Sequence, residues 1–241
     1  MRKSVVTVAL LTFPLAVQGQ HIGPRYTDPR SATVDADGAQ SLFVEARAGM
    51  LRIEGRSGIS RVRVTGTAYA SRREWLDDIR LLARRVGDEV RIVADIPETR
   101  GPSFGESVRG LDLVIEVPAN LAVAVEDGSG EVEVRGVAEL EIDDGSGELV
   151  IEDIGGRVRV TDGSGELRIR NVRGDLWVRD GSGEITAEGI HGSVHIMDDG
   201  SGSIHVDDVG GDFVVEHDDS GSISFDNVKG SVRVPRRRGD S

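Results

Sequence analysis

The sequence predicts an all-β fold: a flattened β-solenoid with two short strands in each turn of about 18 residues. Two observations predict it. Apolar and polar residues alternate through most of the chain, and a Ser-Gly pair recurs six times at spacings of 17, 18, 18, 19 and 19 residues. A fixed short period is typical of a solenoid, because one repeat cannot bury its own apolar face and must stack on the next. The six glycines of the pairs are Gly130, Gly147, Gly165, Gly183, Gly202 and Gly221.

Residues 1–19 are expected to be a secretory signal peptide. The start Met1-Arg2-Lys3 is basic, residues 5–17 are mainly apolar, and Gly19 precedes the expected cleavage point. A membrane anchor is the alternative, but the apolar run is too short to span a bilayer and Pro14 interrupts it. The sequence therefore predicts an exported protein, periplasmic or extracellular, and not an integral membrane protein. It contains no cysteine, so neither a disulfide nor a lipid-bearing thiol is expected.

Two segments are expected before the repeats. Residues 20–40 are rich in Pro, Asp, Gly and Ser without a period, and they are expected to be a flexible N-terminal segment. Residues 41–118 are expected to form a β region that caps the solenoid, beginning with a degenerate turn of the later repeat. Trp75 and its neighbours fit either a helical stripe or a strand; we favour a short helical turn at residues 72–78 and then a hairpin that turns at Gly87. A loop at 98–109 and a strand that ends at Pro118 follow.

Residues 119–235 are expected to form the solenoid of six repeats. Each repeat reads as strand, corner, strand, corner, and each has five apolar positions on one face, all thirty of them apolar. In the third repeat these inward positions are Leu167, Ile169, Val172, Leu176 and Val178. Five positions make a thin core, so we expect two sheets pressed together rather than a wide triangular coil. Glycine in the Ser-Gly corners permits the positive φ angles that such corners need.

The outward positions form columns if equivalent residues of successive turns stack about 4.8 Å apart. Two columns alternate in charge, which favours stacking in register: one holds Arg135, Glu152, Arg170 and Glu188, the other Glu139, Arg157 and Asp175. A third column is entirely acidic, and the sequence offers no stabilising reason for it: Glu131, Glu148, Glu166 and Glu184.

This organisation resembles a family of bacterial envelope proteins known as putative adhesins, a β-helix domain of unknown function. The features that carry the resemblance are the Gly-x-[Leu/Val/Ile]-x-[Ile/Val] strands, the Asp-Gly-Ser-Gly corners, Val117-Pro118 before them and the signal peptide. The resemblance covers about residues 41–234. It implies a right-handed parallel β-helix and an adhesive role, and it carries no catalytic motif.

The aspartates of the corners are the candidate metal ligands. Ca²⁺ takes several oxygen ligands, and a column of carboxylates offers them: Asp127, Asp144, Asp162, Asp180, Asp199 and Asp218. We favour the alternative, that each Asp accepts hydrogen bonds from the amides of its own corner. The Ca²⁺-binding β-roll repeats Gly-Gly-x-Gly-x-Asp every nine residues, and here the second corner differs. No metal and no cofactor are therefore expected.

Two further clusters have alternative interpretations. Four histidines come late in the chain, at 191, 195, 205 and 217, but His195 and His205 fall on different strands of a turn and should face opposite sides. The acidic column could supply paired carboxylates for glycoside cleavage, although Trp177 is the only outward aromatic in the repeats. We expect surface histidines and no catalytic site.

The C-terminus is expected to be a basic, disordered tail at 236–241. It includes Arg238-Gly239-Asp240-Ser241, the tripeptide that integrins bind followed by serine, which we interpret as coincidence. Pro235 and the arginines after it should end the last strand and keep the open edge of the solenoid from pairing.

The charge of the chain narrows the range of its possible partners. The formal charge is −13, and without Arg2 and Lys3 the chain keeps 27 basic against 42 acidic residues, which gives −15. Such a chain repels phosphate backbones, so nucleic acid is not an expected partner. We predict a non-enzymatic solenoid that presents an extended surface for adhesion or envelope interaction, with a protein or glycan as partner. The alternatives are a carbohydrate-active β-helix enzyme and a purely structural envelope spacer.

Overall fold

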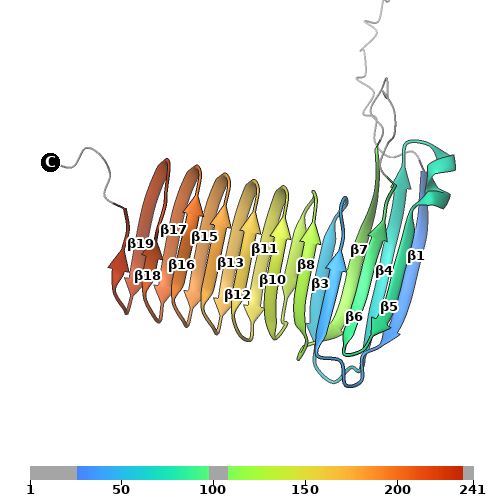
Figure 1. Ribbon diagram of the computed structural model, residues 1–241, viewed down its shortest axis with the longest axis horizontal. Helices are drawn as coiled ribbons and strands as arrows, with labels where there is room; N and C mark the ends of the chain where they lie inside the picture. The colour runs from blue at the N-terminus through green and yellow to red at the C-terminus, as the bar shows by residue number, and fades with distance from the viewer. Residues whose placement is uncertain (1–25, 98–107, 236–241) are drawn as a thin grey trace, which may run out of the picture.

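The computed structural model describes residues 26–97 and 108–235. The signal peptide, most of the loop at 98–109, and the tail with its Arg-Gly-Asp sequence lie outside the described residues. In the described part, two ten-stranded sheets lie face to face along a solenoid (Figure 1). The predicted all-β solenoid with two strands per turn is therefore confirmed, as is the two-sheet core.

Each sheet is a single row of strands. In spatial order, sheet A holds β1 (Tyr26–Asp35), β4 (Arg61–Ala70), β7 (Arg109–Pro118), β3 (Leu51–Arg56), β9 (Val132–Arg135), β11 (Gly147–Ile154), β13 (Gly165–Val172), β15 (Gly183–Ile190), β17 (Gly202–Val209) and β19 (Gly221–Val228). Sheet B holds, again in spatial order, β20 (Val232–Arg233), β18 (Phe213–Val215), β16 (Val194–Asp199), β14 (Leu176–Asp180), β12 (Val158–Asp162), β10 (Glu139–Asp144), β8 (Ala122–Asp127), β2 (Ser41–Glu45), β6 (Glu89–Asp95) and β5 (Arg80–Val86).

The coils stack in parallel, almost residue over residue. Gly147 pairs with Gly165 and Gly165 with Gly183, and the inward residues pair in the same register. Each inward side chain therefore lies on its equivalent in the next coil, and the apolar positions of the first five repeats are all buried. Burial of a branched aliphatic side chain contributes about 1.5–3 kcal/mol. This continuous apolar column holds the two sheets together.

The sixth repeat departs from the expectation. Its five inward residues are only partly buried or are exposed; they are Ile223, Phe225, Val228, Val232 and Val234. The reason is positional: in the described residues β19 and β20 are the outermost strands of their sheets, so no further coil covers them.

The first coil lies between a cap and the repeats. Strands β2 and β3 pair in parallel with β8 and β9 of the repeats on one side, and with β6 and β7 on the other. The chain thus makes one coil, leaves to build the cap at the far end, and returns to stack the repeats on the same coil. In the cap, β5 and β6 form an antiparallel hairpin, and the helical turn is the 3₁₀ segment η1 (Arg73–Asp78). That six-residue segment is too short to cross a bilayer, and the described residues hold no helix that could.

The expectation of a flexible segment at 20–40 is wrong for residues 26–35. These residues form β1, which pairs antiparallel with β4 along its whole length. Ala32 and Val34 face the core, and this short alternation is masked in the sequence by the polar residues around it. Pro29 is compatible because β1 is an edge strand, where a missing N–H disrupts no ladder.

The Ser-Gly corners require glycine for two reasons. The six marker glycines have φ between 138° and 147°, a region that side chains disfavour. The next coil is also too close for a side chain, since a Cβ on Gly165 would lie 1.7 Å from the carbonyl oxygen of Gly147. The corners therefore set both the bend of the chain and the approach of neighbouring coils.

We predict that Gly165→Val destabilises the fold by more than about 3 kcal/mol, because strain and a backbone clash coincide there. Ser164→Ala is the matched control: Ser164 donates its backbone amide to Asp162, and alanine keeps that amide. Thermal melts by circular dichroism compare the two variants with the wild type. A Gly165→Val variant that melts with the wild type would show that the corners tolerate a side chain.

Candidate functional site

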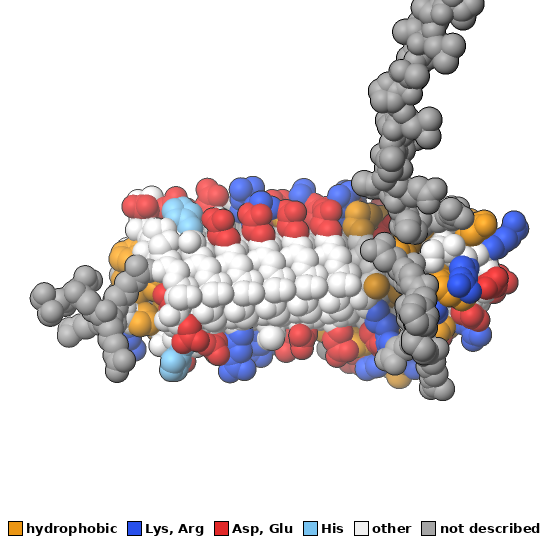
Figure 2. Space-filling view, turned by 90° about the horizontal axis from the view of Figure 1, so that it is seen from above, with side chains coloured by type: hydrophobic (Ala, Val, Ile, Leu, Met, Phe, Trp, Pro, Cys, Tyr) orange, Lys and Arg blue, Asp and Glu red, His pale blue; other side chains and the backbone are white. Residues whose placement is uncertain are grey.

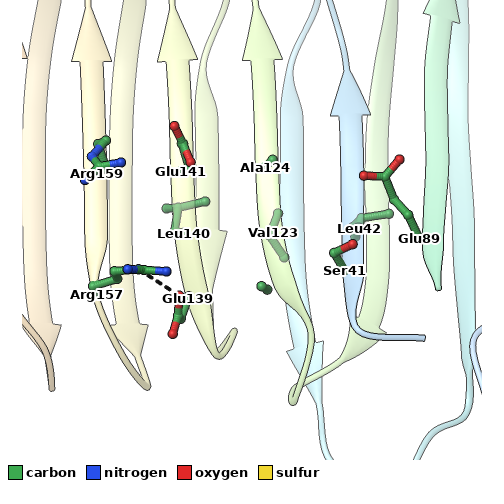
Figure 3. A pocket seen from close by; sticks show the side chains of 11 residues that line it. Ser41, Leu42, Glu89, Val123, Ala124, Glu139, Leu140, Glu141, Arg157 and Arg159 are labelled. Atoms are coloured by element: carbon green, nitrogen blue, oxygen red, sulfur yellow. Dashed lines mark hydrogen bonds and ion pairs between the residues drawn. The ribbon is translucent and has the colours of Figure 1, made fainter. Parts of the chain in front are cut away.

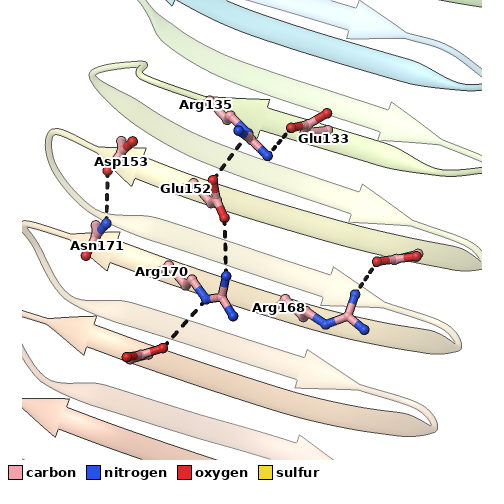
Figure 4. Close-up of polar contacts among 9 residues, drawn as sticks. Glu133, Arg135, Glu152, Asp153, Arg168, Arg170 and Asn171 are labelled. Carbon is pink, nitrogen blue, oxygen red and sulfur yellow. Dashed lines mark hydrogen bonds and ion pairs between the residues drawn. The ribbon is translucent and has the colours of Figure 1, made fainter.

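The outward face of sheet A pairs its charges internally. Arg135 contacts Glu152 at 3.3 Å, Glu152 contacts Arg170 at 3.7 Å, and Arg170 contacts Glu188 at 3.6 Å (Figure 4). The alternating column predicted from the sequence is therefore confirmed as a ladder of ion pairs between coils. Exposed pairs of this kind contribute at most about 1 kcal/mol each, so their main effect is to fix register.

The all-acidic column has a partner that the sequence analysis missed. Arg168 lies in the neighbouring column of β13, and its guanidinium forms ion pairs with both Glu148 and Glu166. At the start of the face, Glu133 is paired with Arg52 at 2.6 Å and also with Arg135. Arg168 thus balances two members of the acidic column from the adjacent column, whereas Glu131 and Glu184 form no ion pair among the described residues.

The second corner is tied together between coils. Glu139 and Arg157 form the expected ion pair at 2.9 Å, but Asp175 instead accepts a hydrogen bond from the backbone amide of Ser193 at 2.8 Å. In a later coil Asp212 accepts from the amide of Ser231 at 2.8 Å, and this bond lowers the pKa of the Asp212 carboxyl. The carboxylates of Asp175 and Asp212 therefore bond one coil to the next.

A second periodic column at this corner was also missed. Six residues have φ between 51° and 70°, and they recur at the spacing of the Ser-Gly pairs: Gly136, Asp153, Asn171, Gly189, Asp208 and Asn227. Gly, Asn and Asp are the residues that tolerate the left-handed conformation. Asn171 also donates to Asp153 in the preceding coil at 3.1 Å (Figure 4). Their shared type and period were readable in the sequence.

Sheet B presents a different face, centred on one column of outward residues that we call the sheet B column. Register places its members side by side on successive strands: Phe43, Ala124, Glu141, Arg159, Trp177, His195 and Val214. The rings of Trp177 and His195 stack with centroids 5.7 Å apart and planes 9° apart. The guanidinium of Arg159 lies 5.8 Å from the Trp177 ring, and that of Arg91 lies 5.0 Å from Phe43. Aromatic and cation–π contacts thus follow this column.

A shallow depression interrupts the sheet B column. Its volume is about 230 Å³, and its lining includes the small side chains Ala122 and Ala124. Figure 3 shows Ala124 among the other lining residues. Glu89 lines one side, and Glu139 with Arg157 lines the other. The depression lies on an open face and combines small apolar side chains with charged ones, which suits a contact surface.

Along the edge of the solenoid that Figure 2 shows, backbone and uncharged side chains form a band between rows of charged side chains.

Two histidines lie on opposite sides of the solenoid, as the sequence predicted. His195 lies on β16 of sheet B, and His205 lies on β17 of sheet A, where its Nδ1 is 3.0 Å from the Ser224 hydroxyl. Within the ranges that the structure describes, no three His, Cys, Asp or Glu side chains are grouped so that they could hold a metal ion.

The corner aspartates face the interior, which the sequence analysis did not foresee. Asp144, Asp162, Asp180 and Asp199 are at most 4% exposed and pair in register from coil to coil. Asp162 accepts a hydrogen bond from the Ser164 amide at 3.2 Å, as the corner interpretation expected. Both carboxylate oxygens of Asp199, however, are buried without a hydrogen-bond partner among the described residues. The result is a buried ladder of carboxyl groups.

Burial and mutual repulsion disfavour ionisation of this ladder. Burial, followed by the charge of Asp127, raises the pKa of Asp144 to about 6. Burial, then Asp162 and Asp199, raises the pKa of Asp180 to about 6, and burial, then Asp218, does the same for Asp199. Amides of the corners lower the pKa of Asp144 and Asp180 but do not offset burial. These three carboxyl groups therefore take up protons at mildly acidic pH.

No family model and no curated protein match the chain. Among solved structures, it is similar to a putative cell adhesion protein from Clostridium sporogenes (TM-score 0.37, 12% identity, 86% of this chain and 98% of the other covered). It is also similar to a putative adhesin from Bacteroides fragilis (0.30, 13%, 87% and 97%) and a putative lipid binding protein from Parabacteroides distasonis (0.33, 13%, 86% and 97%). These three TM-scores are below 0.5, so the similarity carries no argument about function.

We predict that the protein becomes more stable as the pH falls from 7.5 to 5. A carboxyl group with a raised folded-state pKa binds its proton more tightly in the folded state; this stabilisation is complete below the ordinary value near 4 and is lost as the pH rises through about 6. Each kcal/mol gained raises the melting temperature by about 2–4 °C.

The matched pair for this prediction is Asp144→Asn and Asp143→Asn. Asp144 is buried in the ladder, whereas Asp143 points outward on the same strand. Melting temperatures measured across this pH range should rise less in Asp144→Asn and as much as the wild type in Asp143→Asn. Equal slopes in all three proteins would contradict a proton-binding ladder.

We also predict that Ca²⁺ gives no selective stabilisation. The carboxylates are enclosed in the core, and the described residues offer no grouped set of ligands. Melts with Ca²⁺, Mg²⁺ and chelator at matched ionic strength should coincide for the two ions. A large gain with Ca²⁺ alone would make the corner aspartates a binding site.

Proposed function

We propose that this chain is a non-enzymatic, exported β-solenoid whose sheet B face binds a protein or glycan of the cell envelope, as an adhesin or envelope-interaction protein does. The observation that carries the proposal is the contrast between the two faces. Sheet A pairs its charges with one another, whereas the sheet B column collects Trp177, His195 and Arg159 on an open surface. Tryptophan and arginine dominate the energetics of binding surfaces.

The shape of the face fits an extended partner. Each member of the column pairs directly with the next from Phe43 on β2 to Val214 on β18, and the depression over Ala124 lies within it. A partner that lies along the solenoid axis can therefore contact successive coils. Envelope proteins and glycans have the required length, whereas the negative net charge opposes nucleic acid.

The arrangement of carboxylates supports a role without catalysis. A glycosidase needs one carboxyl group free to donate a proton and another free to attack or activate water. On sheet A, Glu148 and Glu166 are held by Arg168, and beside the depression Glu139 is held by Arg157. The carboxyl groups with raised pKa are inside the core, out of reach of a polymeric substrate.

Binding of the chain from residue 20 onward to envelope fractions and to a glycan array tests the proposal. Trp177→Ala and Arg159→Ala should weaken binding at least tenfold, which corresponds to about 1.4 kcal/mol. Arg168→Ala and Thr186→Ala, on the sheet A face, are the matched controls and should bind like the wild type. Melting curves verify that each variant is folded.

Three results would contradict the proposal. An equal loss of binding in the sheet A variants would show that the binding face is not confined to sheet B. A wild-type chain that binds no envelope fraction or glycan would favour the structural spacer. Release of reducing ends from a bound glycan would favour the enzyme.

A further inference from the structure

The C-terminal end of the solenoid is an uncovered apolar surface. Phe225 is 42% exposed and Val232 is 38% exposed, although the equivalent Val206 and Phe213 in the preceding coil are fully buried. The ring of Phe225 packs against Phe213 on its inner side, with centroids 5.8 Å apart. Its outer side has the apolar character of an interface between coils, and no coil among the described residues covers it.

At the opposite end of the solenoid, the two edge strands carry residues that oppose pairing, although Leu82 and Val86 of β5 are 47% and 51% exposed. Edge strand β1 carries Pro29, and η1 packs against β1 and β4 beside that edge. The other edge strand, β5, carries Arg80, Arg84 and Arg85. Proline and positive charge are the usual means by which edge strands avoid pairing, and solenoids need terminal units with a polar outer face.

At the C-terminal edge, β20 carries Arg233 and is followed by Pro235, but β19 has little of this protection. Strand β19 carries no proline, lysine or arginine, and its outward Ser222 and Ser224 are already bonded to Ser203 at 2.9 Å and His205 at 3.0 Å. Its one charged residue is Asp226. Eight residues of strand edge are thus available beside the apolar surface.

The charge of the last coil also differs from that of its neighbour. Residues 202–220 contain six acidic residues and no lysine or arginine, whereas residues 221–235 contain Asp226, Lys229 and Arg233, and Arg236, Arg237, Arg238 and Asp240 follow them in the sequence. The last coil itself, residues 221–235, therefore lacks the acidic excess of the coil before it, and two such coils can approach without the carboxylate repulsion that the rest of this acidic chain imposes.

We propose that a second copy of this chain docks on the C-terminal coil, with β19 of the two copies paired antiparallel about a two-fold axis perpendicular to the sheets. The surface is then self-complementary, as a two-fold interface requires. Pairing through β19 is favoured because it offers eight residues of edge and β20 offers two. The docked coil covers Phe225 and Val232, as a seventh coil would.

This dimer has a consequence for binding. The consequence rests on the proposed function, whereas the dimer itself is independent of it. A two-fold axis perpendicular to the sheets leaves both sheet B faces pointing the same way. Two sheet B columns then follow one another along one surface, and a long partner can engage both. Linked sites of this kind raise avidity without any new contact.

Sedimentation equilibrium of the chain from residue 20 onward tests the dimer at micromolar concentration and about 150 mM salt, near physiological ionic strength. The wild type should have twice the monomer mass, and Phe225→Glu or Val232→Glu should be monomeric. Leu82→Glu is the matched control, because Leu82 is a 47% exposed apolar residue at the opposite end, and this variant should stay dimeric. Melting curves verify that the variants are folded.

Cross-linking gives an independent measurement. The chain has no cysteine, so Ser224→Cys, near the middle of β19, carries a single thiol. Mild oxidation should link it into covalent dimers, whereas Leu82→Cys should form no covalent dimer under the same conditions. A monomeric wild type would overturn the proposal and agree with a tail that blocks the edge. An open series of masses, or cross-linking through residue 82 instead of 224, would also overturn the proposal and would indicate head-to-tail assembly.

Discussion

The structure depends on one constraint: successive coils stack in parallel at strand spacing, almost residue over residue. This places every residue against its own equivalent in the neighbouring coil, so each position of the repeat becomes a column. Apolar columns gain from this arrangement, and so do columns that alternate in sign, such as the one through Glu152 and Arg170. Glycine columns at the corners allow the close approach itself. The same spacing that stabilises these columns penalises any column of like charges.

The two acidic columns answer this penalty in different ways. On the outward face of sheet A, Arg168 neutralises Glu148 and Glu166 from the adjacent column. Inside the core no cation reaches Asp180 among the described residues, so its pKa rises and a proton takes the place of the cation. The negative charge of the exposed column is thus neutralised by an arginine side chain, whereas that of the buried column is neutralised by protons from the solvent. Sheet B has no comparable network along its main column, which leaves its arginine and aromatic groups for a partner.

Much of the fold was predictable, because the period and the apolar alternation are local properties of the sequence. The same reasoning identified the ladder through Arg170 and the placement of His195 and His205 on opposite sheets. It missed relations that need three-dimensional geometry. The bridging by Arg168 crosses between columns, the inward direction of Asp144 depends on the path of the corner, and β1 is held by a partner strand well separated from it in the chain. The stacking of Trp177 on His195, which defines the candidate binding face, depends on rotamers.

The position of the first coil has a consequence for how the chain folds. Neighbouring repeats pair across 17–19 residues, so coils can be added one after another with short loops. Strand β2, in contrast, pairs with β8 at Ser41 and Ala122, about 80 residues apart, because the whole cap is inserted between them. Contacts of such long sequence separation carry the largest loop-closure entropy and slow folding. The junction between cap and repeats is therefore the expected kinetic bottleneck, and the repeats on its far side can form while it is still open.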